Sequence, residues 1–320
     1  MSASPPDAAG VTWRPIEDGD IPAVAALATA VDAAERLEFV GGPEHWKWWL
    51  AQHDLAVDTI LAVDEQGTVV GVAGSHRTDT DAGARAIIWF DGHPARLDLE
   101  PVLLDWGIAT AAEQVEAAAH PDKAIRVFTE EHRTRRRRLL EANGFAEARR
   151  FVDMERSLTG HLPEPRPLPD GVEVIHWTPD RDQPARLVSN AAFRDHWGSL
   201  PIDPATWASR EIDEEVIRRD CSFVAACGGT AVAICLAEVD REDDDAKMWI
   251  ARVGTDPEWQ RRGLASHLLA RSLGAGAAAG LLTTVLTVDE ESRFDATALY
   301  AGLGYRVTNR TIAYALGDRT

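Results

Sequence analysis

The chain contains little cysteine and no apolar segment long enough to cross a membrane. Only three of its 320 residues are cysteine, and Cys221, Cys227 and Cys235 lack the spacing to histidine that a zinc site requires. This excludes a disulfide framework, and we expect reduced cysteines on neighbouring core strands and no metal centre. No apolar run approaches the roughly 20 residues of a transmembrane helix, and no signal-peptide pattern is present at the start of the chain. We therefore expect a cytoplasmic protein that does not bind membranes.

Positive charge is also scarce. The chain has 33 Lys and Arg against 52 Asp and Glu, a net charge of −19. Such a surface repels nucleic acid and anionic lipid, which argues against a nucleic-acid-binding regulator. It would attract a cationic amine, although an acidic surface also simply keeps a protein in solution. The length and the 45% hydrophobic content suit two globular domains of about 150 residues each.

The sequence divides into two halves that begin and end with similar segments, as in an internal repeat. Val11–Pro15 opens the first half and Val172–Pro179 the second, and each half closes on a similar segment, Leu139–Phe145 and Leu299–Tyr305. Prolines at alternate positions between the halves cannot form a helix or a central strand, which predicts a semi-rigid linker. The predicted divisions are an N-terminal domain at 11–157, a linker at 158–171 and a C-terminal domain at 172–317.

Hydrophobic periodicity predicts alternating strands and helices in both halves. The strands expected in the second half are Val172–Trp177, Ser222–Ala226, Ala231–Val239, Lys247–Val253, Leu281–Val288 and Arg306–Leu316. The helices expected there are Pro184–Phe193, Pro204–Arg218, one that begins at Arg262, and Asp295–Gly302. The first half is expected to contain strands Thr59–Val63, Val69–Ser75, Arg85–Phe90 and Ile125–Thr129 and helices Pro101–Ala119 and Arg135–Asn143.

The most informative segment is 253–265, which reads as a strand, a turn and a glycine-containing loop that opens into a helix. The first N–H groups of a helix have no partner within it, and they lie at the positive end of the helix dipole. Gly263 and Ala265 allow a ligand to approach this backbone closely. The segment therefore predicts a phosphate site.

Two motifs resemble those of the GNAT superfamily, which transfers acyl groups from coenzyme A to amines. Gln260-x-x-Gly263-x-Ala265 resembles its pyrophosphate motif, and the segment 288–305, with its Leu-Tyr-x-x-x-Gly-aromatic end, resembles its second signature. The order of both halves resembles a tandem GNAT protein. The segment 192–198 further resembles the mycothiol synthase-like two-domain acetyltransferases of actinobacteria. The resemblance implies an α/β (α+β) fold with two tandem GNAT domains, each a mixed, mainly antiparallel twisted sheet flanked by helices.

The resemblance also implies where acetyl-CoA, the expected co-substrate, would bind. The strand before the loop would pair with the pantetheine arm, a bulge at Gly254 would open the acetyl slot, and the loop amides would hold the diphosphate. Tyr300 would act as the general acid that protonates the leaving thiolate. Ser292 would cap the following helix or hydrogen-bond the cofactor. The expected cofactor-binding residues are Val253, Gly254, Thr255, Gln260, Arg261, Arg262, Gly263, Leu264, Ala265, Ser266 and Ser292.

The general base stays open at this point. Many GNAT relatives use a glutamate on the strand that leads into the phosphate loop, but Lys247–Val253 contains no carboxylate. Glu238 on the preceding strand, Asp195 and His196 are the candidates, and an ordered water chain is a further alternative. Three tryptophans either line an acceptor pocket or belong to the core: Trp197, Trp207 and Trp249.

The first half lacks most of this chemistry. Asp98 and Glu100 place negative charge where phosphates would lie, and Leu140 stands where the second half has Tyr300. We therefore predict that the first half has lost catalysis and is a structural partner. The basic run His132–Arg138 is expected to be a solvated helix face balanced by nearby glutamates, and the alternative is a phosphate grip.

These observations predict an acetyl-CoA-dependent N-acetyltransferase whose active site lies in the C-terminal domain. The acceptor would be a small-molecule amine or a peptide N-terminus, and both a monomer and a homodimer remain open. The alternative is a non-catalytic acyl-CoA-binding or sensor protein, which the missing strand carboxylate favours.

Overall fold

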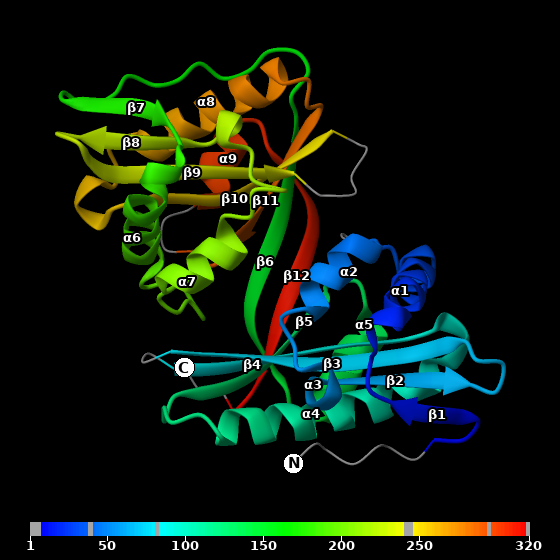
Figure 1. Ribbon diagram of the computed structural model, residues 1–320. Coiled ribbons are helices and arrows are strands. Elements are labelled where there is room, and N and C mark those ends of the chain that lie inside the picture. Colours follow the sequence, from blue (N-terminus) through cyan, green and yellow to red (C-terminus); the bar gives the residue numbers. More distant parts are fainter. Residues whose placement is uncertain (1–7, 38–40, 81–82, 240–245, 293–295, 318–320) are drawn as a thin grey trace. The chain divides into compact units, whose positions relative to one another are not determined.

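The computed structural model describes residues 8–37, 41–80, 83–239, 246–292 and 296–317, and these form two compact units (Figure 1). Unit 1 combines the chain up to Arg150 with the residues from Asn309 onward, and unit 2 runs from Phe151 to Thr308. These divisions differ from the sequential domains expected from the sequence.

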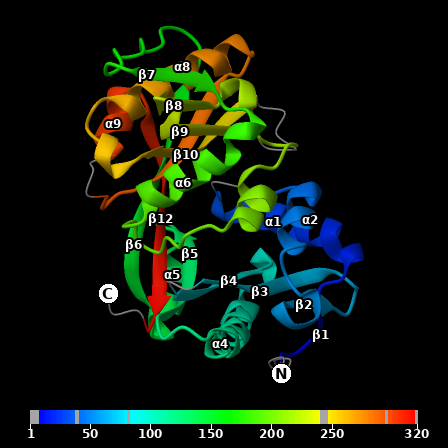
Figure 2. The same ribbon diagram turned by 60° about the vertical axis from the view of Figure 1, so that its left-hand side comes forward.

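Two long strands account for the difference, and Figure 2 shows each as one continuous arrow. Strand β6 (Ala146–Ser157) pairs with unit 2 from Phe151, and strand β12 (Arg306–Leu316) pairs with unit 1 from Thr311. Unit 1 therefore obtains its sixth strand from the segment that follows unit 2, and unit 2 begins with a strand that the sequence assigned to the N-terminal domain.

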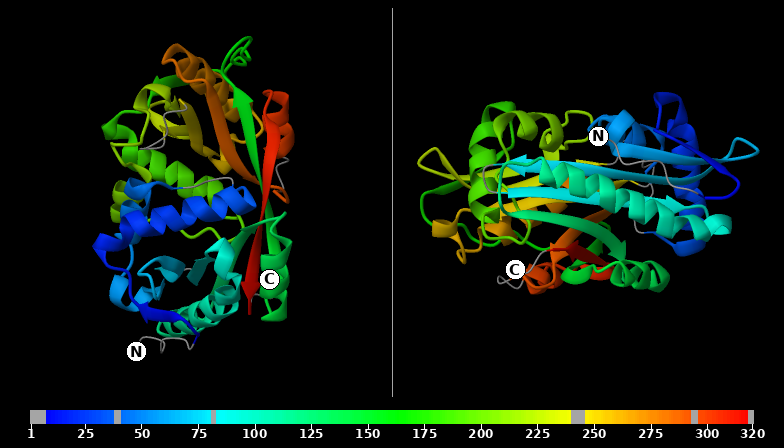
Figure 3. Two further views of the ribbon diagram at one scale, coloured as in Figure 1. Left: turned by 90° about the vertical axis from the view of Figure 1, so that its right-hand side faces the viewer. Right: turned by 90° about the horizontal axis from the view of Figure 1, so that it is seen from below.

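The sheet of unit 1 has the order β1-β2-β3-β4-β5-β12. Its neighbouring strands are antiparallel except for the parallel pair β4 and β5. Helix α4 lies along one face of β3 and β4, as Figure 3 shows, and α1 packs on the opposite side. The strands of this unit are β1 (Val11–Arg14), β2 (Thr59–Asp64), β3 (Val69–Thr80), β4 (Gly83–Gly92) and β5 (Lys123–Glu130). Its helices are η1 (Asp18–Asp20), α1 (Ile21–Glu35), α2 (Pro43–Leu50), α3 (Leu55–Asp58), η2 (Pro94–Leu99), α4 (Glu100–Glu116) and α5 (Thr134–Ala142).

The sheet of unit 2 has the order β6-β11-β10-β9-β8-β7, and here β10 and β11 are the parallel pair. The predicted mixed, mainly antiparallel sheets flanked by helices are thus confirmed in both units. The remaining strands of this unit are β7 (Val172–His176), β8 (Phe223–Cys227), β9 (Thr230–Val239), β10 (Lys247–Thr255) and β11 (Thr283–Asp289). Its helices are η3 (Pro179–Arg181), α6 (Asp182–Phe193), α7 (Pro204–Thr206), η4 (Trp207–Glu211), η5 (Arg219–Cys221), η6 (Pro257–Trp259), α8 (Leu264–Ala278) and α9 (Ala296–Gly302).

Successive side chains of β9 point alternately to the two faces of the unit 2 sheet, and each face has its own core. Ile234 and Leu236 pack into a core with α6 and η4, whereas Cys235 packs into a second core with α8. The leucines of α8 at helical spacing make this second core continuous, because 3.6-residue periodicity brings them to one side: Leu264, Leu268, Leu269 and Leu273. We call the two sides of the sheet the α6 face and the α8 face.

The helix predicted over Pro204–Arg218 is wrong beyond Glu211. Val239 donates to the Val216 carbonyl at 2.9 Å, and Arg218 donates to the Ala237 carbonyl at 2.8 Å. β9 extends further than its neighbour β8, whose pairing begins opposite Cys235. The free edge of β9 therefore takes up residues 216–218 as backbone partners, because buried N–H and C=O groups must be paired.

The segment 158–171 forms neither a helix nor a strand, but it is attached to unit 2. Arg156 donates to the His161 carbonyl at 2.9 Å, and His267 Nδ1 lies 2.5 Å from the Arg166 carbonyl oxygen. Leu162 and Leu168 pack against the core on the α8 face. The prolines therefore do not leave a free tether, since two hydrogen bonds and two leucines hold this segment to its unit.

All three cysteines carry free thiols, and two of them lie on the adjacent strands β8 and β9. Cys221 lies instead in the short turn η5. Within the described ranges no helix combines the length and the hydropathy that crossing a bilayer requires. The same residues include no group of three or more His, Cys, Asp or Glu side chains arranged to hold a metal ion.

Candidate active site

Strands β10 and β11 diverge after a short parallel pairing. Their register runs from Lys247 opposite Thr283 to Trp249 opposite Val285, after which both strands continue without pairing to each other. Backbone groups that face such a gap can pair with an extended ligand as an added strand would. We use the word slot for these two strand segments that follow the pairing and do not pair with each other, and the phosphate-loop segment comes directly after β10.

The predicted bulge at Gly254 is wrong. The register of β10 against β9 shifts between Ile250 and Arg252, so that Ala251 is the extra residue, while Gly254 pairs regularly with Ile234. A Cβ at Gly254 would lie 3.1 Å from the Ala192 Cβ on α6. Glycine at this position lets α6 approach the strand closely, and the bulge itself lies three residues earlier.

The loop that follows β10 is locally determined. Asp256 accepts a hydrogen bond from the Glu258 amide at 2.9 Å, which starts the turn η6. Arg261 and Gly263 have φ values of 61° and 82°, and α8 begins directly afterwards at Leu264. A Cβ at Gly263 would meet nothing within 4 Å, so the space in front of the first turn of α8 is open. A diphosphate would find unpaired helix amides there.

The side chains predicted around this loop have different surroundings. Arg262 folds back, because it donates to the Glu258 carbonyl at 3.0 Å and its guanidinium lies 4.7 Å from the centre of the Trp259 ring. Gln260 donates to the Thr255 carbonyl at 3.4 Å and steadies the loop. Leu264 and Ser266 are buried in the first turn of α8, and Val253 packs against the same core. Arg261 is exposed, and Ala265 is half-buried.

Ser292 follows β11, and its amide donates to the Asp289 carbonyl at 3.1 Å. The helix cap predicted for it falls on residues 293–295, which lie outside the described residues. Its predicted contact with the cofactor therefore stays a prediction.

Tyr300 lies on α9 with its ring centre 6.0 Å from that of Tyr305. The Tyr305 hydroxyl lies 3.2 Å from the Thr284 hydroxyl, whereas within the described residues no such bond is found for Tyr300. Burial, and then the neighbouring Cys235, raises the pKa of the Tyr300 phenol. Tyr300 therefore stays protonated at neutral pH and has a proton to donate, while Tyr305 serves packing.

Glu238, one of the predicted candidates for the base, lies on β9, directly beside the strand that contains no carboxylate. It stands opposite Trp249 in the register of β9 and β10, and it shares the α6 face with Leu236. Burial, followed by the charge of Glu211, raises the pKa of the Glu238 carboxyl from an ordinary 4.5 to about 7, although Arg252 opposes the rise. A carboxyl group with this pKa changes its protonation state near neutrality, which suits a general base.

The other two candidates for the base follow the end of α6. The His196 ring lies 4.7 Å from the Phe193 ring, and Asp195 precedes it in the chain. Trp207 is fully buried and stacks on Trp177 at 6.3 Å, so it belongs to the core on the α6 face.

Sequence reasoning missed the partners of Glu238 on the α6 face. The Arg252 Nε donates to Glu211 at 2.5 Å, although forty-one residues separate the two in the chain. Glu211 was expected inside a long helix and Arg252 inside a regular strand. The register of β9 and β10 brings Arg252 near Glu238, and the packing of η4 on the α6 face brings Glu211 close enough for its charge to act on the same carboxyl.

In unit 1 the helix that corresponds to α8 is α4, and charged side chains of the unit itself occupy its first turn. Glu100, the first residue of α4, is buried and paired with Arg135, and burial raises the pKa of its carboxyl. Arg133 and Arg136 each donate to Asp91 at 2.9 Å. The predicted solvated face is therefore wrong for these two arginines, which are 8% and 5% exposed. They form part of an internal ion-pair network, and Leu140 is fully buried in the apolar core.

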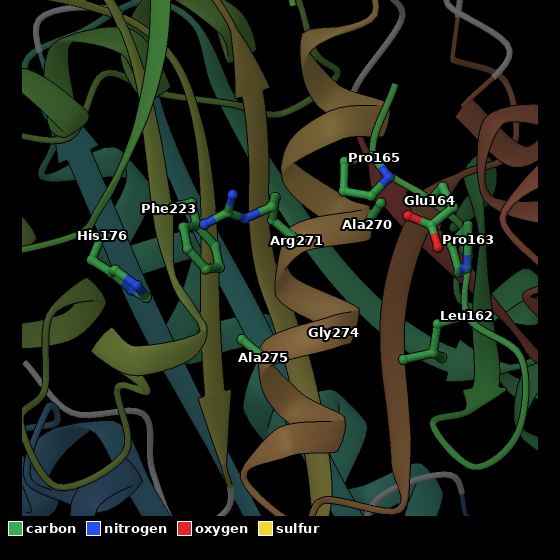
Figure 4. A pocket seen from close by; sticks show the side chains of 10 residues that line it. All are labelled: Leu162, Pro163, Glu164, Pro165, His176, Phe223, Ala270, Arg271, Gly274 and Ala275. Atoms are coloured by element: carbon green, nitrogen blue, oxygen red, sulfur yellow. The ribbon is translucent and has the colours of Figure 1, made fainter. Parts of the chain in front are cut away.

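A separate cavity of about 400 Å³ lies along α8 (Figure 4). Arg271 extends from the helix over the Phe223 ring, at 5.3 Å from its centre, while Glu164 lies on the other side of the helix. None of the predicted site residues lines this cavity. Its residues are Leu162, Pro163, Glu164, Pro165, His176, Phe223, Ala270, Arg271, Gly274 and Ala275.

Known proteins that are similar to this chain are acetyltransferases. Residues 189–305 match the acetyltransferase (GNAT) family. The chain is 30% identical over 266 residues to a mycothiol acetyltransferase of Streptomyces bingchenggensis, and the alignment covers 80% of each chain. It is 32% identical over 189 residues to a mycothiol acetyltransferase of Thermobispora bispora, and here the alignment covers 57% of this chain and 62% of the relative.

Solved structures show the same fold over nearly the whole chain. A GCN5-related N-acetyltransferase from Sphaerobacter thermophilus superimposes with a TM-score of 0.79 at 22% identity, covering 96% of both chains. A tandem GNAT protein from the clavulanic acid biosynthesis pathway gives a TM-score of 0.68 at 14% identity and covers 95% of this chain and 98% of its own.

Proposed function

This chain belongs to the GNAT family of acetyltransferases, as its two motifs predicted, and from that premise we propose that unit 2 transfers the acetyl group of acetyl-CoA to a primary amine. The protein is an acyltransferase of the GNAT type, and members of this family use acetyl-CoA as co-substrate. Our proposal adds the location of the site, the residues that act there and the nature of the acceptor.

The divergence of β10 and β11 beside Glu238 is the observation that supports the proposal most. The slot begins after Trp249, directly opposite Glu238 in the register, and leads toward the helix start at Gly263. The slot suits an extended pantetheine arm, and the helix start suits a diphosphate. Unit 1 is proposed to be non-catalytic, because Glu100 already occupies the start of α4 with negative charge.

In the proposed reaction, the nitrogen of the amine attacks the carbonyl carbon of the thioester. Glu238 accepts the proton that the nitrogen loses, and the carbon–sulfur bond of the tetrahedral intermediate breaks. Tyr300 then donates its phenolic proton to the departing sulfur. A base with a pKa near 7 and an acid that stays protonated at neutral pH divide the two proton transfers between them.

The proposed acceptor is a primary amine on a small molecule. The relatives named above are mycothiol acetyltransferases, so their acceptor is the first compound to test. A peptide N-terminus is the second class of acceptor, and a panel of both classes would distinguish them.

Thiol release from acetyl-CoA in the presence of each amine tests the proposal. Glu238→Gln and Tyr300→Phe should each lower kcat by roughly 10²–10⁴ and leave acetyl-CoA binding unchanged. Glu173→Gln on β7 and Tyr305→Phe are matched controls, and both should keep their turnover. Wild-type turnover in both site variants would refute the assigned roles, and failure to bind acetyl-CoA would refute the proposal as a whole.

A further inference from the structure

Arg252 lies beside Glu238 because of the bulge at Ala251. Without the extra residue, Arg252 would stand opposite Cys235, whose side chain faces the apolar core under α8. With it, Arg252 stands opposite Leu236 on the α6 face, two positions along β9 from Glu238. Diagonal neighbours of this kind are roughly 7–8 Å apart, which an arginine side chain can span.

The Arg252 guanidinium is fixed by two other elements of the α6 face. Its Nε donates to Glu211 on η4 at 2.5 Å, and its Nη1 lies 3.5 Å from the Ser189 hydroxyl on α6. The Phe193 and Trp207 rings lie 5.6 and 5.8 Å from its central carbon. The side chains of Arg252 and Glu211 are only 21% and 23% exposed. This cation is therefore held in one position rather than moving freely in solvent.

Charges from three segments influence Glu238. Glu211 on η4 and Asp213 in the segment after it disfavour ionisation of the Glu238 carboxyl, and Arg252 on β10 favours it. Ile217, which bridges Glu238 on the other edge of β9, adds an apolar wall. Among these groups Arg252 supplies the positive charge and Glu211 sets its position.

We propose that Arg252, oriented by Glu211, is a positioning residue that keeps the Glu238 carboxyl ready to take up a proton from the acceptor amine. The inference rests on the proposed role of Glu238 as the base, and Arg252 itself contacts no reacting atom. It acts through charge at a fixed distance, which the bulge at Ala251 makes possible.

Two substitutions should move the titration of Glu238 in opposite directions. Arg252→Met removes the positive charge and retains an apolar side chain between the two rings, so the midpoint should rise by about one pH unit. Glu211→Gln removes a negative charge and releases the guanidinium toward Glu238, so the midpoint should fall by a similar amount. A role for Arg252 in packing alone predicts no such opposition.

The test is a carbon-13 NMR titration of the glutamate carboxyl groups in the full-length chain, with the Glu238 signal identified by its loss in Glu238→Gln. Arg252→Lys retains the charge and should restore the wild-type midpoint to within a few tenths of a pH unit. Arg219→Gln is the control, because Arg219 pairs with Asp182 and Glu214 elsewhere in unit 2. If Arg252→Met fails to fold, Glu211→Gln and Arg252→Lys still decide the outcome.

An unchanged or lowered midpoint in Arg252→Met, or a raised midpoint in Glu211→Gln, would overturn the inference. The pH dependence of kcat/KM in the same variants tests the proposed function separately. If the NMR midpoints move as expected and the acid limb of the activity profile does not follow them, Arg252 tunes the Glu238 carboxyl as inferred, but Glu238 is not the base and the role of Arg252 toward the acceptor amine fails together with the proposed function.

Discussion

Replacing Glu238 with glutamine should make unit 2 more stable at pH 8, although it removes the proposed base. Folding raises the pKa of this carboxyl from an ordinary 4.5 to about 7, so the folded chain binds its proton more tightly than the unfolded chain does. The difference of about 2.5, at about 1.4 kcal/mol for each tenfold change, corresponds to about 3–4 kcal/mol as an upper value. Partial exposure of the side chain reduces the expected gain to about 1–3 kcal/mol.

The size of this stabilisation depends on pH. Below pH 4.5 the carboxyl is protonated in both states and costs nothing. Wild-type stability falls as the pH rises from 4.5 to about 7, because the folded state must then ionise a carboxyl group in an unfavourable site. Above about pH 7 the cost is constant. Glutamine has no charge to bury, so the extra stability of Glu238→Gln over the wild type should be absent at pH 4 and complete at pH 8.

Calorimetry of the full-length chain at pH 4 and pH 8 measures this directly. For a unit of this size each kcal/mol moves Tm by roughly 2–4 °C, so the unit 2 transition should rise by about 2–12 °C at pH 8 only. Glu173→Gln on β7, which removes the same charge at an exposed position, should change Tm equally little at both values. A Glu238→Gln variant with the same Tm change at pH 4 and pH 8, or with none, would refute the electrostatic account of Glu238.

Three further substitutions test the rest of the site. Tyr300→Phe should lower kcat by roughly 10²–10⁴ with an unchanged KM for acetyl-CoA, and stopped-flow measurement of thiol release will show whether the loss lies in this step; equal turnover would remove Tyr300 from the mechanism. Gly263→Val forces a β-branched residue to φ 82°, which should distort the loop before α8. Calorimetric titration should then find at least tenfold weaker acetyl-CoA binding, and unchanged affinity would contradict the predicted diphosphate site. Gly254→Ala brings a methyl group to 3.1 Å from the Ala192 Cβ, and this contact should lower the free energy of unfolding by about 1–2 kcal/mol. Thermal unfolding measures this loss, and a stabilised variant would show that α6 is free to move.

The sequence was sufficient for the features that depend on local patterns. The leucines of α8 recur at helical spacing, and strands such as Arg306–Leu316 have the composition and bounds that the structure shows. Gly263 begins α8 in the left-handed conformation that a motif with glycine at that position requires. These features follow from the chain within a few residues of each position.

Features that depend on strand register could not be predicted. Whether the extra residue of β10 is Ala251 or Gly254 changes which side chains reach the α6 face, and it is visible only from the pairs that β10 makes with β9. The helix expected to reach Arg218 stops at Glu211 because a free strand edge competes for its backbone. The arginines after His132 looked like a surface run, since nothing in that segment reveals that Asp91 lies beside Arg133 and Arg136.

The positions of β6 and β12 in the chain affect how this protein can be made. The sheet of unit 1 needs residues 311–316, which are synthesised only after the whole of unit 2, so the N-terminal part of the chain must wait for unit 2 to be made before its sixth strand arrives. Cutting the gene within 158–171 would give two fragments that each lack a strand, and both would expose an unpaired sheet edge that is prone to aggregation. The two units have separate cores, but unit 1 is complete only when the strand that follows unit 2 in the chain has been made.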